Sequence, residues 1–533
     1  MRRAFSVSTI QNFSPKPNQI SYPYLSLIEK CNNLKDSNKI HAHIITLGLA
    51  NFTYITSRIL SFYVARNVMH YAVRLFDQIP TPTIFNWNAM MIGFSKSPRP
   101  EKSLFVYSRM RCRGVSPDMH TFPCLIKACS DRASMSQVHG QAIKFSFDGD
   151  VFVTSSLISG YCRLSEVELA YNVFDKSPNR NVVCWTSLIS GYSSCGLVEK
   201  AREIFDRAPE RNDVSWSAMI SGYVQNERHL EAIELFRELR DRVRVKLNRA
   251  LLVSVLTASG ALGASDEGKW IHAYIDEKGF EYGPELGTAL VDFYAKCGLI
   301  ECSREVFDKM PRKDVTAWSA MIMGEALNGH CQSALKIFCE MLENKIMPNA
   351  ITFIGVLTAC NHGGLVDEGR LYFDSMSKSY SINPSIEHYG CIVDLLSRAG
   401  CTAEADMLIQ KMPMEPDAAI WGSLLNGCMM HGHVELGERA GRRVIELEPG
   451  RCGRYVSLAN VYAMVGRWEG VMEVRRAMRE RGVKITPGWS LIEVDGVGHR
   501  FLVDDKVHPQ LGEISKMLEL VSSCLERMKD ESL

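Results

Sequence analysis

The sequence carries almost no net charge, because its 61 lysine and arginine residues are balanced by 60 aspartate and glutamate residues. The formal charge of +1 at pH 7 excludes the strongly basic surface with which many proteins bind nucleic acid. Any such binding must therefore rest on individually placed side chains. The sequence also lacks an apolar run of the ~18–20 residues that a membrane-spanning helix needs. We therefore expect no membrane partner.

A C-x-x-C pair is absent, although the chain has 17 cysteines. Zinc fingers and zinc-dependent deaminases need such a pair to hold their metal. His431–Glu435 reads H-G-H-V-E and contains the H-x-E half of the deaminase signature, but the P-C-x-x-C half is missing. We expect the cysteines to be core thiols, and we predict no metal site, no cofactor and no catalytic residue.

Acidic residues are absent before Glu29, whereas Arg2, Arg3 and Lys16 stand among several serines. This composition is typical of an organelle transit peptide, which we place at residues 1–20. An ordinary unstructured start is the alternative. The pair Arg2 and Arg3 favours the mitochondrion, with the chloroplast as the alternative compartment.

Repetition is the main feature that the sequence does have. The motif S-W-S-A-M-I-S-G-Y at Ser215–Tyr223 recurs with variations, and its tryptophans are Trp87, Trp185, Trp216, Trp318 and Trp421. A second motif, A-x-x-x-F-D-x-x-P, runs in phase with the first, and its phenylalanines are Phe76, Phe174, Phe205 and Phe307. A period of roughly 31–36 residues is typical of a solenoid, whose function lies along a surface and not in one pocket.

Two motifs per repeat predict two helices per repeat. In Val315–Asn349, Trp318 and Ile322 share one face of the first helix, and Gly329 lies in the break that follows. Phe338 belongs to the second helix. Each pair has too much apolar surface to stand alone, so we expect neighbouring pairs to stack. The tryptophans should lie in the core between helices.

These motifs resemble those of plant pentatricopeptide repeat proteins, in the class that alternates P-, L- and S-type units and ends in E and E+ extension motifs without a DYW deaminase domain. The resemblance implies an all-α, right-handed superhelical solenoid of helical hairpins. It places units at 21–52, 53–83, 84–118, 119–150, 151–181, 182–212, 213–248, 249–283, 284–314, 315–349, 350–385 and 386–417. Unit 119–150 is about three residues shorter than usual for its L type, which leaves its register open.

The sequence beyond the repeats has a different pattern of residues. The resemblance implies two helical extension motifs at 418–486 and a C-terminal extension at 487–533. In the latter, two β-rich runs around Asp495 and Gly496 predict a hairpin, and a helix follows from about His508 to Met528. In the L-type units, His41, His139 and His272 recur in phase, which predicts a structural role for them.

Two residues of each unit are implied to read one RNA base: the fifth, which follows the tryptophan position, and the last. The fifth residues of most P- and S-type units are small and polar, whereas Leu25, Pro123, Val253 and Ile354 in L-type units and Gly390 cannot read a base edge. The predicted reading residues are Asn88 with Asp118, Ser155 with Asn181, Thr186 with Asn212, Ser217 with Asn248, Thr288 with Asp314, and Ser319 with Asn349. Ser57 with Thr83 fits no standard pair. The alternative is that these residues are solvated positions or helix caps.

The resemblance implies sequence-specific binding of a single-stranded organellar RNA, and with it the recognition of a site for C-to-U editing. The deaminase would come in trans from a deaminase-bearing pentatricopeptide repeat protein, recruited through the extension, together with several organellar editing accessory factors. Two alternatives stay open. One is RNA splicing, processing or stabilisation without editing, and the other is a protein-binding helical-repeat scaffold. The missing C-x-x-C pair argues against a self-sufficient deaminase.

Overall fold

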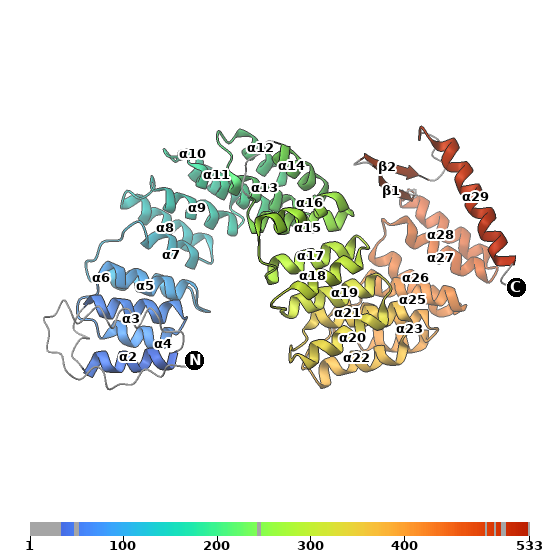
Figure 1. The fold of residues 1–533 in the computed structure, drawn as a ribbon, viewed down its shortest axis with the longest axis horizontal. Coiled ribbons are helices and arrows are strands. Elements are labelled where there is room, and N and C mark those ends of the chain that lie inside the picture. Colours follow the sequence, from blue (N-terminus) through green and yellow to red (C-terminus); the bar gives the residue numbers. More distant parts are fainter. Residues whose placement is uncertain are drawn as a thin grey trace. The chain divides into compact units, whose positions relative to one another are not determined.

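The computed structural model describes residues 34–46, 53–241, 247–484, 488–494, 497–502 and 508–530 (Figure 1). The predicted transit peptide and the first part of unit 21–52 lie outside these residues. The chain divides into two compact units, Met1–Ser254 and Val255–Leu533. In the part of the chain that is described, no helix is both long and apolar enough to cross a membrane.

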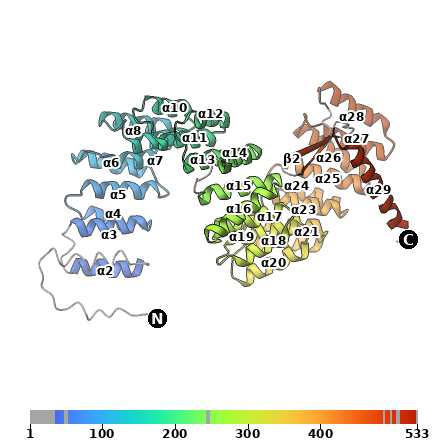
Figure 2. The ribbon, with the colours of Figure 1, turned by 45° about the horizontal axis from the view of Figure 1, so that its top comes forward.

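The first compact unit consists of consecutive helices. They are α2 (Leu34–Thr46), α3 (Thr53–Ala65), α4 (Met69–Asp77), α5 (Ile84–Ser95), α6 (Lys102–Cys112), α7 (Thr121–Ala128), α8 (Arg132–Lys144), α9 (Val151–Arg163), α10 (Val167–Lys176), α11 (Val182–Ser194), α12 (Val198–Arg207), α13 (Asp213–Gln225) and α14 (His229–Asp241). Helix α15 (Arg249–Leu262) begins in this unit and continues into the second. Helix α3 packs against α4 and helix α5 against α6. Figure 2 shows these helices following one another in chain order.

The second compact unit continues the pattern. Its helices are α16 (Ser265–Lys278), α17 (Pro284–Lys296), α18 (Ile300–Lys309), α19 (Val315–Leu327), α20 (Cys331–Glu343), α21 (Ala350–Gly363), α22 (Val366–Lys378), α23 (Ile386–Arg398), α24 (Thr402–Gln410), α25 (Ala418–His431), α26 (Val434–Leu447), α27 (Cys452–Met464) and α28 (Trp468–Glu480). Each predicted repeat from 53–83 to 386–417 holds two helices, and its described residues contain no strand. The all-α class of stacked hairpins is therefore confirmed.

The two sequence motifs meet in the core of each stack. The phenylalanine near the end of one repeat lies edge-on against the tryptophan of the next: Phe205 and Trp216 have ring centroids 5.0 Å apart, and so do Phe307 and Trp318. Trp216 and Trp318 are 4% and 6% exposed, which confirms their predicted burial. Such edge-to-face contacts add to the gain from burying the rings themselves. The two sequence motifs recur with the same period because a phenylalanine of one motif and a tryptophan of the other form a contact between neighbouring repeats.

The L-type histidines form a second periodic contact. Nδ1 of His41, His139 and His272 lies 3.0, 3.0 and 2.6 Å from the hydroxyl of Tyr63, Tyr161 and Tyr294, always in the next repeat. Burial lowers the pKa of each histidine, which keeps the imidazole neutral near pH 7. The predicted structural role is confirmed.

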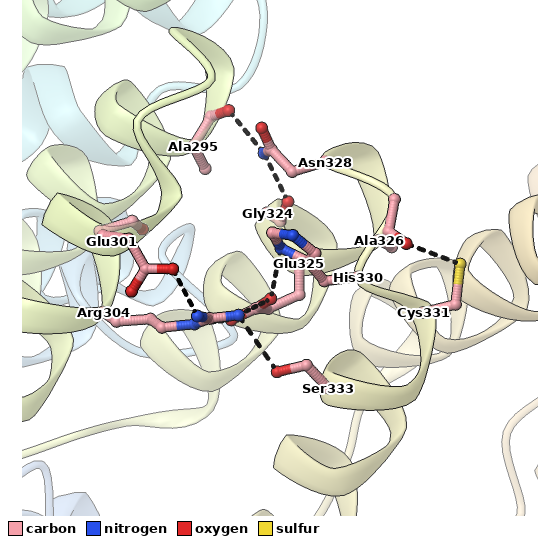
Figure 3. Close-up of polar contacts among 12 residues, drawn as sticks. Ala295, Glu301, Arg304, Gly324, Glu325, Ala326, Asn328, His330, Cys331 and Ser333 are labelled. Atoms are coloured by element: carbon pink, nitrogen blue, oxygen red, sulfur yellow. Dashed lines mark hydrogen bonds and ion pairs between the residues drawn. The ribbon is translucent and has the colours of Figure 1, made fainter.

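Several repeats carry a tyrosine at the position of Tyr161 and Tyr294, but helix α19 carries Glu325 at that position. Its carboxylate is fully buried, and Arg304 of α18 donates to both of its oxygens, from Nε at 2.5 Å and from Nη2 at 2.6 Å (Figure 3). Nδ1 of His330 lies 3.3 Å from Glu325 Oε2. Arg304 also donates to the exposed Glu301, at 2.8 Å. The buried charge is thus held by one bidentate partner from the preceding repeat.

The C-terminal segment contains the predicted hairpin and helix. Strands β1 (Trp489–Val494) and β2 (Val497–Leu502) pair antiparallel, with Ile492 opposite His499, and α29 (Leu511–Asp530) follows. The predicted turn at Asp495 and Gly496 lies outside the described residues. Helix α29 exposes a row of large apolar side chains, namely Met517, Leu518, Leu520 and Val521.

Candidate nucleic-acid interface

The predicted last residues of the repeats all accept a backbone hydrogen bond from the helix that opens the next repeat, and all but Asp118, which precedes the N-cap residue His120, stand at the N-cap of that helix. In each case the side-chain Oδ1 accepts a hydrogen bond from a backbone N–H three residues later. The N–O distances are 3.0 Å for Asp118 and Thr121, 3.1 Å for Asn181 and Cys184, 3.0 Å for Asn212 and Ser215, 2.9 Å for Asn248 and Leu251, 3.0 Å for Asp314 and Ala317, and 2.9 Å for Asn349 and Thr352. The cap alternative therefore describes a real role of these residues. This role occupies only one of the two polar atoms at the end of each side chain.

The second polar atom differs between the two residue types. Because the backbone N–H donates to the capping atom, that atom is an oxygen, and the second atom is Nδ2 in asparagine and Oδ2 in aspartate. None of these second atoms has a hydrogen-bond partner among the described residues. Asparagine therefore presents a donor and aspartate an acceptor at the same place in the repeat.

A third residue links the fifth and last positions in several repeats. The hydroxyl of Thr121 donates to Asn88 at 2.8 Å and can donate to Asp118 at 2.9 Å, and Asn88 Nδ2 donates to Asp118 at 2.9 Å. Ser215 lies 3.3 Å from Thr186 and 3.1 Å from Asn212. These two bridging hydroxyls belong to the first turn of the following helix.

The same bridge recurs at two further places. Thr352 lies 2.7 Å from Ser319 and 3.0 Å from Asn349. Asn86 connects Ser57, at 2.8 Å, with Thr83, at 2.7 Å. The sequence reasoning missed these bridging residues, although the repeated motif held the signal: Asn86 and Ser215 directly precede the tryptophan of their repeats.

Other predicted pairs are connected differently. Ser217 reaches Asn248 directly, at 3.4 Å. Among the described residues, no hydrogen bond joins Ser155 to Asn181 or Thr288 to Asp314, where Cys184 and Ala317 occupy the bridging position. The hydroxyl of Ser155 donates to its own helix at Phe152, at 3.2 Å, and the buried hydroxyl of Thr288 has no partner there. The structure therefore connects the fifth and last residues in four of the predicted pairs and leaves two unconnected.

Exposed apolar residues stand one helical turn before the fifth positions. These are Tyr54, Phe85, Phe152, Val183, Val214 and Ile351, which are 49–62% exposed. Between α3 and α5, Tyr54 and Phe85 line a hollow together with Ser57, Arg58 and Thr83. The interface thus offers apolar walls around a polar floor, whereas the tryptophans are buried elsewhere. These wall residues were not identified from the sequence.

The histidines of the H-x-E motif have structural partners. Nε2 of His431 lies 2.8 Å from the carbonyl oxygen of Arg398, and Nδ1 of His433 lies 2.6 Å from the hydroxyl of Thr402. Within the described ranges, no group of three or more histidine, cysteine, aspartate or glutamate side chains is placed to hold a metal ion.

Substitution of the N-cap residue Asn349 tests the capping role of these residues. Asn349→Ala should cost about 1 kcal/mol in the stability of α21, because the first turn loses its side-chain acceptor, whereas Asn349→Asp should be nearly neutral. Amide hydrogen exchange in α21 measures both effects. Equal protection in the alanine and aspartate variants would contradict the capping role.

Comparison with known proteins places this geometry in a family. A model of the PPR repeat family matches residues 82–131 and 313–362, and a PPR repeat model matches 152–182, 183–212, 214–242 and 288–315. Pentatricopeptide repeat-containing protein At5g66520 of Arabidopsis thaliana is 44% identical over 511 residues, which cover 95% of this chain and 82% of that protein. The chain belongs to the pentatricopeptide repeat family.

Further comparisons describe this pentatricopeptide repeat protein in more detail. An E motif model matches residues 431–493. A mitochondrial relative of Arabidopsis thaliana, At2g22410, is 40% identical over 97% of this chain and 76% of its own length, and a chloroplastic one, At1g08070, is 38% identical over 95% and 83%. The crystal structure of PPR10 from maize is similar with a TM-score of 0.48 and 15% identity, over 89% of this chain and 80% of that chain. PPR10 has also been crystallised with an 18-nt psaJ RNA element, and that structure gives a TM-score of 0.42 over 87% of this chain and 84% of that chain, again at 15% identity.

Proposed function

We propose that this pentatricopeptide repeat protein binds single-stranded organellar RNA in a sequence-specific manner, one base per repeat. The observation that carries the proposal is the free second atom of each capping asparagine or aspartate. This atom recurs beside a small polar fifth residue and exposed apolar walls. Stacking of a base against an aromatic wall residue, such as Tyr54, Phe85 or Phe152, contributes roughly 1–3 kcal/mol, so a few repeats suffice without a basic surface.

The atom that remains free after capping accounts for base choice. A free Nδ2–H donor complements the unprotonated ring nitrogen on the pairing edge of A or C, and a free Oδ2 acceptor complements the ring N–H of G or U. Family members with a small hydroxyl at the fifth position favour purines, and those with asparagine favour pyrimidines. Repeats 84–349 of this chain then read 5′-U-N-A-A-A-N-G-A-3′, with N for the L-type repeats. U comes from Asn88 with Asp118, and G comes from Thr288 with Asp314.

The biological role that best fits the E motif is to specify a site for C-to-U editing, with the chemistry performed by a deaminase-bearing partner and accessory factors. Support comes from the E motif at 431–493 and from the apolar row that α29 exposes. In this role the chain positions the RNA and carries out no covalent step. We place it in the mitochondrion. Sequencing of organellar cDNA from a null plant tests the editing role, because a single unconverted C supports editing, whereas altered transcript lengths support processing.

Asn88→Thr should change the preferred base at the first read position from U to G. Threonine replaces a pyrimidine-favouring amide, while Asp118 keeps its acceptor. The shift between the two RNAs should be about 1–3 kcal/mol, as for other misread base edges. Titration of the variant with RNAs that differ only at this base measures it.

Asn88→Ala is the matched control, because it removes the amide without supplying a hydroxyl. It should weaken binding without favouring G. If Asn88→Thr instead weakens all RNAs equally, Asn88 supports the network of Asp118 and Thr121 and does not read the base.

A further inference from the structure

A pocket lies between α8, α9 and α10, and no predicted RNA-contacting residue lines it. We call it the α8–α10 pocket, and its lining includes His139, Leu157, Tyr161, Val173, Lys176 and Ser177. Leu157 and Val173 provide apolar walls. The polar groups of the lining are His139 on α8, Tyr161 on α9, Asn172 and Lys176 on α10, Ser177 just after α10, and Asp148 between α8 and α9. The pocket is therefore separate from the surface proposed to read RNA.

The corresponding place around His272 is filled by the chain itself. His272 and Tyr294 form the same contact as His139 and Tyr161, with the same spacing of 22 residues. Ten residues after His272, the hydroxyl of Tyr282 lies 2.9 Å from His272 Nε2, and the two rings meet edge-on with centroids 5.9 Å apart. Tyr282 also donates to Asp276.

The residue in the place of Tyr282 in the shorter repeat is Gly149, which has no ring to offer. Nε2 of His139 consequently has no hydrogen-bond partner in the part of the chain that the structure describes. Ser177 lines the pocket as well, and its hydroxyl is buried without a partner among those same residues, with the residue only 6% exposed. An unpaired buried hydroxyl is costly, so a ligand that supplies a hydrogen bond gains from meeting it.

We infer that the α8–α10 pocket binds a para-substituted phenol, with the ring between Leu157 and Val173 and the hydroxyl at His139 Nε2. Tyr282 shows how such a ring satisfies the equivalent histidine within this same chain. The ligand's hydroxyl can belong to a small phenolic molecule or to a tyrosine side chain of another protein. Ile143 replaces Asp276 here, so a second hydrogen bond would come from another polar residue of the lining, namely Asp148 or Ser177.

Titration of the full chain with p-cresol tests this inference, with the methyl NMR signals of Leu157 and Val173 as the readout. We expect saturable shifts of these methyl groups. Toluene, which lacks only the hydroxyl, should bind on the order of tenfold more weakly, because one hydrogen bond is lost. Equal binding of toluene, or shifts elsewhere but not at these methyls, would overturn the inference. N-acetyltyrosinamide separates the sources: binding at least as tight as that of p-cresol identifies a polypeptide tyrosine, and weaker binding identifies a small phenol.

Gly149→Tyr provides a matched variant that fills the pocket from within. A Cβ at Gly149 would meet only Pro178, at the ordinary contact distance of 3.6 Å, so the first atom of a side chain fits at this position. The variant should lose p-cresol binding while retaining RNA affinity. Should it fail to fold, the toluene comparison on the unmodified chain decides the matter. Because the pocket lies apart from the reading residues, its failure would leave the RNA-binding proposal untouched.

Discussion

Arg304→Ala is expected to destabilise the repeats around α19 by about 3–5 kcal/mol, which is the usual cost of leaving a buried charge without its partner. The Glu325 carboxylate is fully buried and takes both of its strong hydrogen bonds from Arg304. Once the guanidinium is gone, only His330 remains beside it among the described residues, at 3.3 Å. Amide hydrogen exchange in α18, α19 and α20 of the full chain measures the loss locally, which suits an array in which each repeat contacts only its neighbours.

Two variants make this result interpretable. Glu301→Ala removes only an exposed partner of Arg304 and should change protection by less than about 1 kcal/mol. Arg304→Ala combined with Glu325→Tyr should recover much of the loss, because tyrosine occupies this place in neighbouring repeats, as Tyr294 does. Similar losses in the single and combined variants would show that Arg304 acts through packing and not through the carboxylate.

Deletion of residues 487–533 is expected to abolish editing at the target C while RNA affinity stays nearly unchanged. The deleted segment contains β1, β2 and α29, and none of the predicted reading residues. Editing at the target site in complemented null plants and RNA titration of the purified chain measure the two effects. If affinity collapses with editing, the segment belongs to the RNA-reading surface.

A double substitution in α29 distinguishes the effect of deleting the whole segment 487–533 from the effect of removing only the exposed apolar side chains of this helix. Leu518→Glu with Val521→Glu places charges on the exposed face of α29 without shortening the chain. It should reduce editing as the deletion does, because an apolar partner surface would have to bury both charges. Matched changes at exposed polar positions of α29, such as Ser515→Glu, should have little effect. Full editing by the double variant would place recruitment elsewhere.

Periodic contacts were predictable from the sequence because every repeat makes them. Trp318 and Phe307 recur in register, so their burial followed from spacing, and the phase of His272 indicated a structural role without identifying Tyr294 as its partner. The hairpin of β1 and β2 followed from β-rich runs and a turn signal. The proposed reading residues were named from the register of the repeats, and they stay a prediction, whereas the capping bonds that they form are visible only in the structure.

Contacts that occur once were not predictable. Arg304 and Glu325 read as ordinary charges in the sequence, because the bidentate contact joins different helices. The register of repeat 119–150 could not be settled from the sequence for a similar reason, because it also involves a contact between different helices. The shortage falls on α7, which spans Thr121–Ala128, and Arg163 of α9 donates to the carbonyl oxygens of Ile126 and Cys129 near its end, at 2.8 and 2.9 Å. A guanidinium from the next repeat thus satisfies groups that further helical turns would otherwise pair.

The capping oxygen has a consequence for how such a protein changes its target over generations. Asparagine and aspartate both supply that oxygen, and their codons differ by one base, so under the proposed mode of RNA reading their exchange would alter the letter read while the helix start is preserved. Most substitutions lower the free energy of unfolding of a marginally stable protein, whereas the exchange of asparagine and aspartate at a cap lowers it little. A drifting RNA site can therefore be followed by single mutational steps, each of which leaves a folded intermediate for selection to act on.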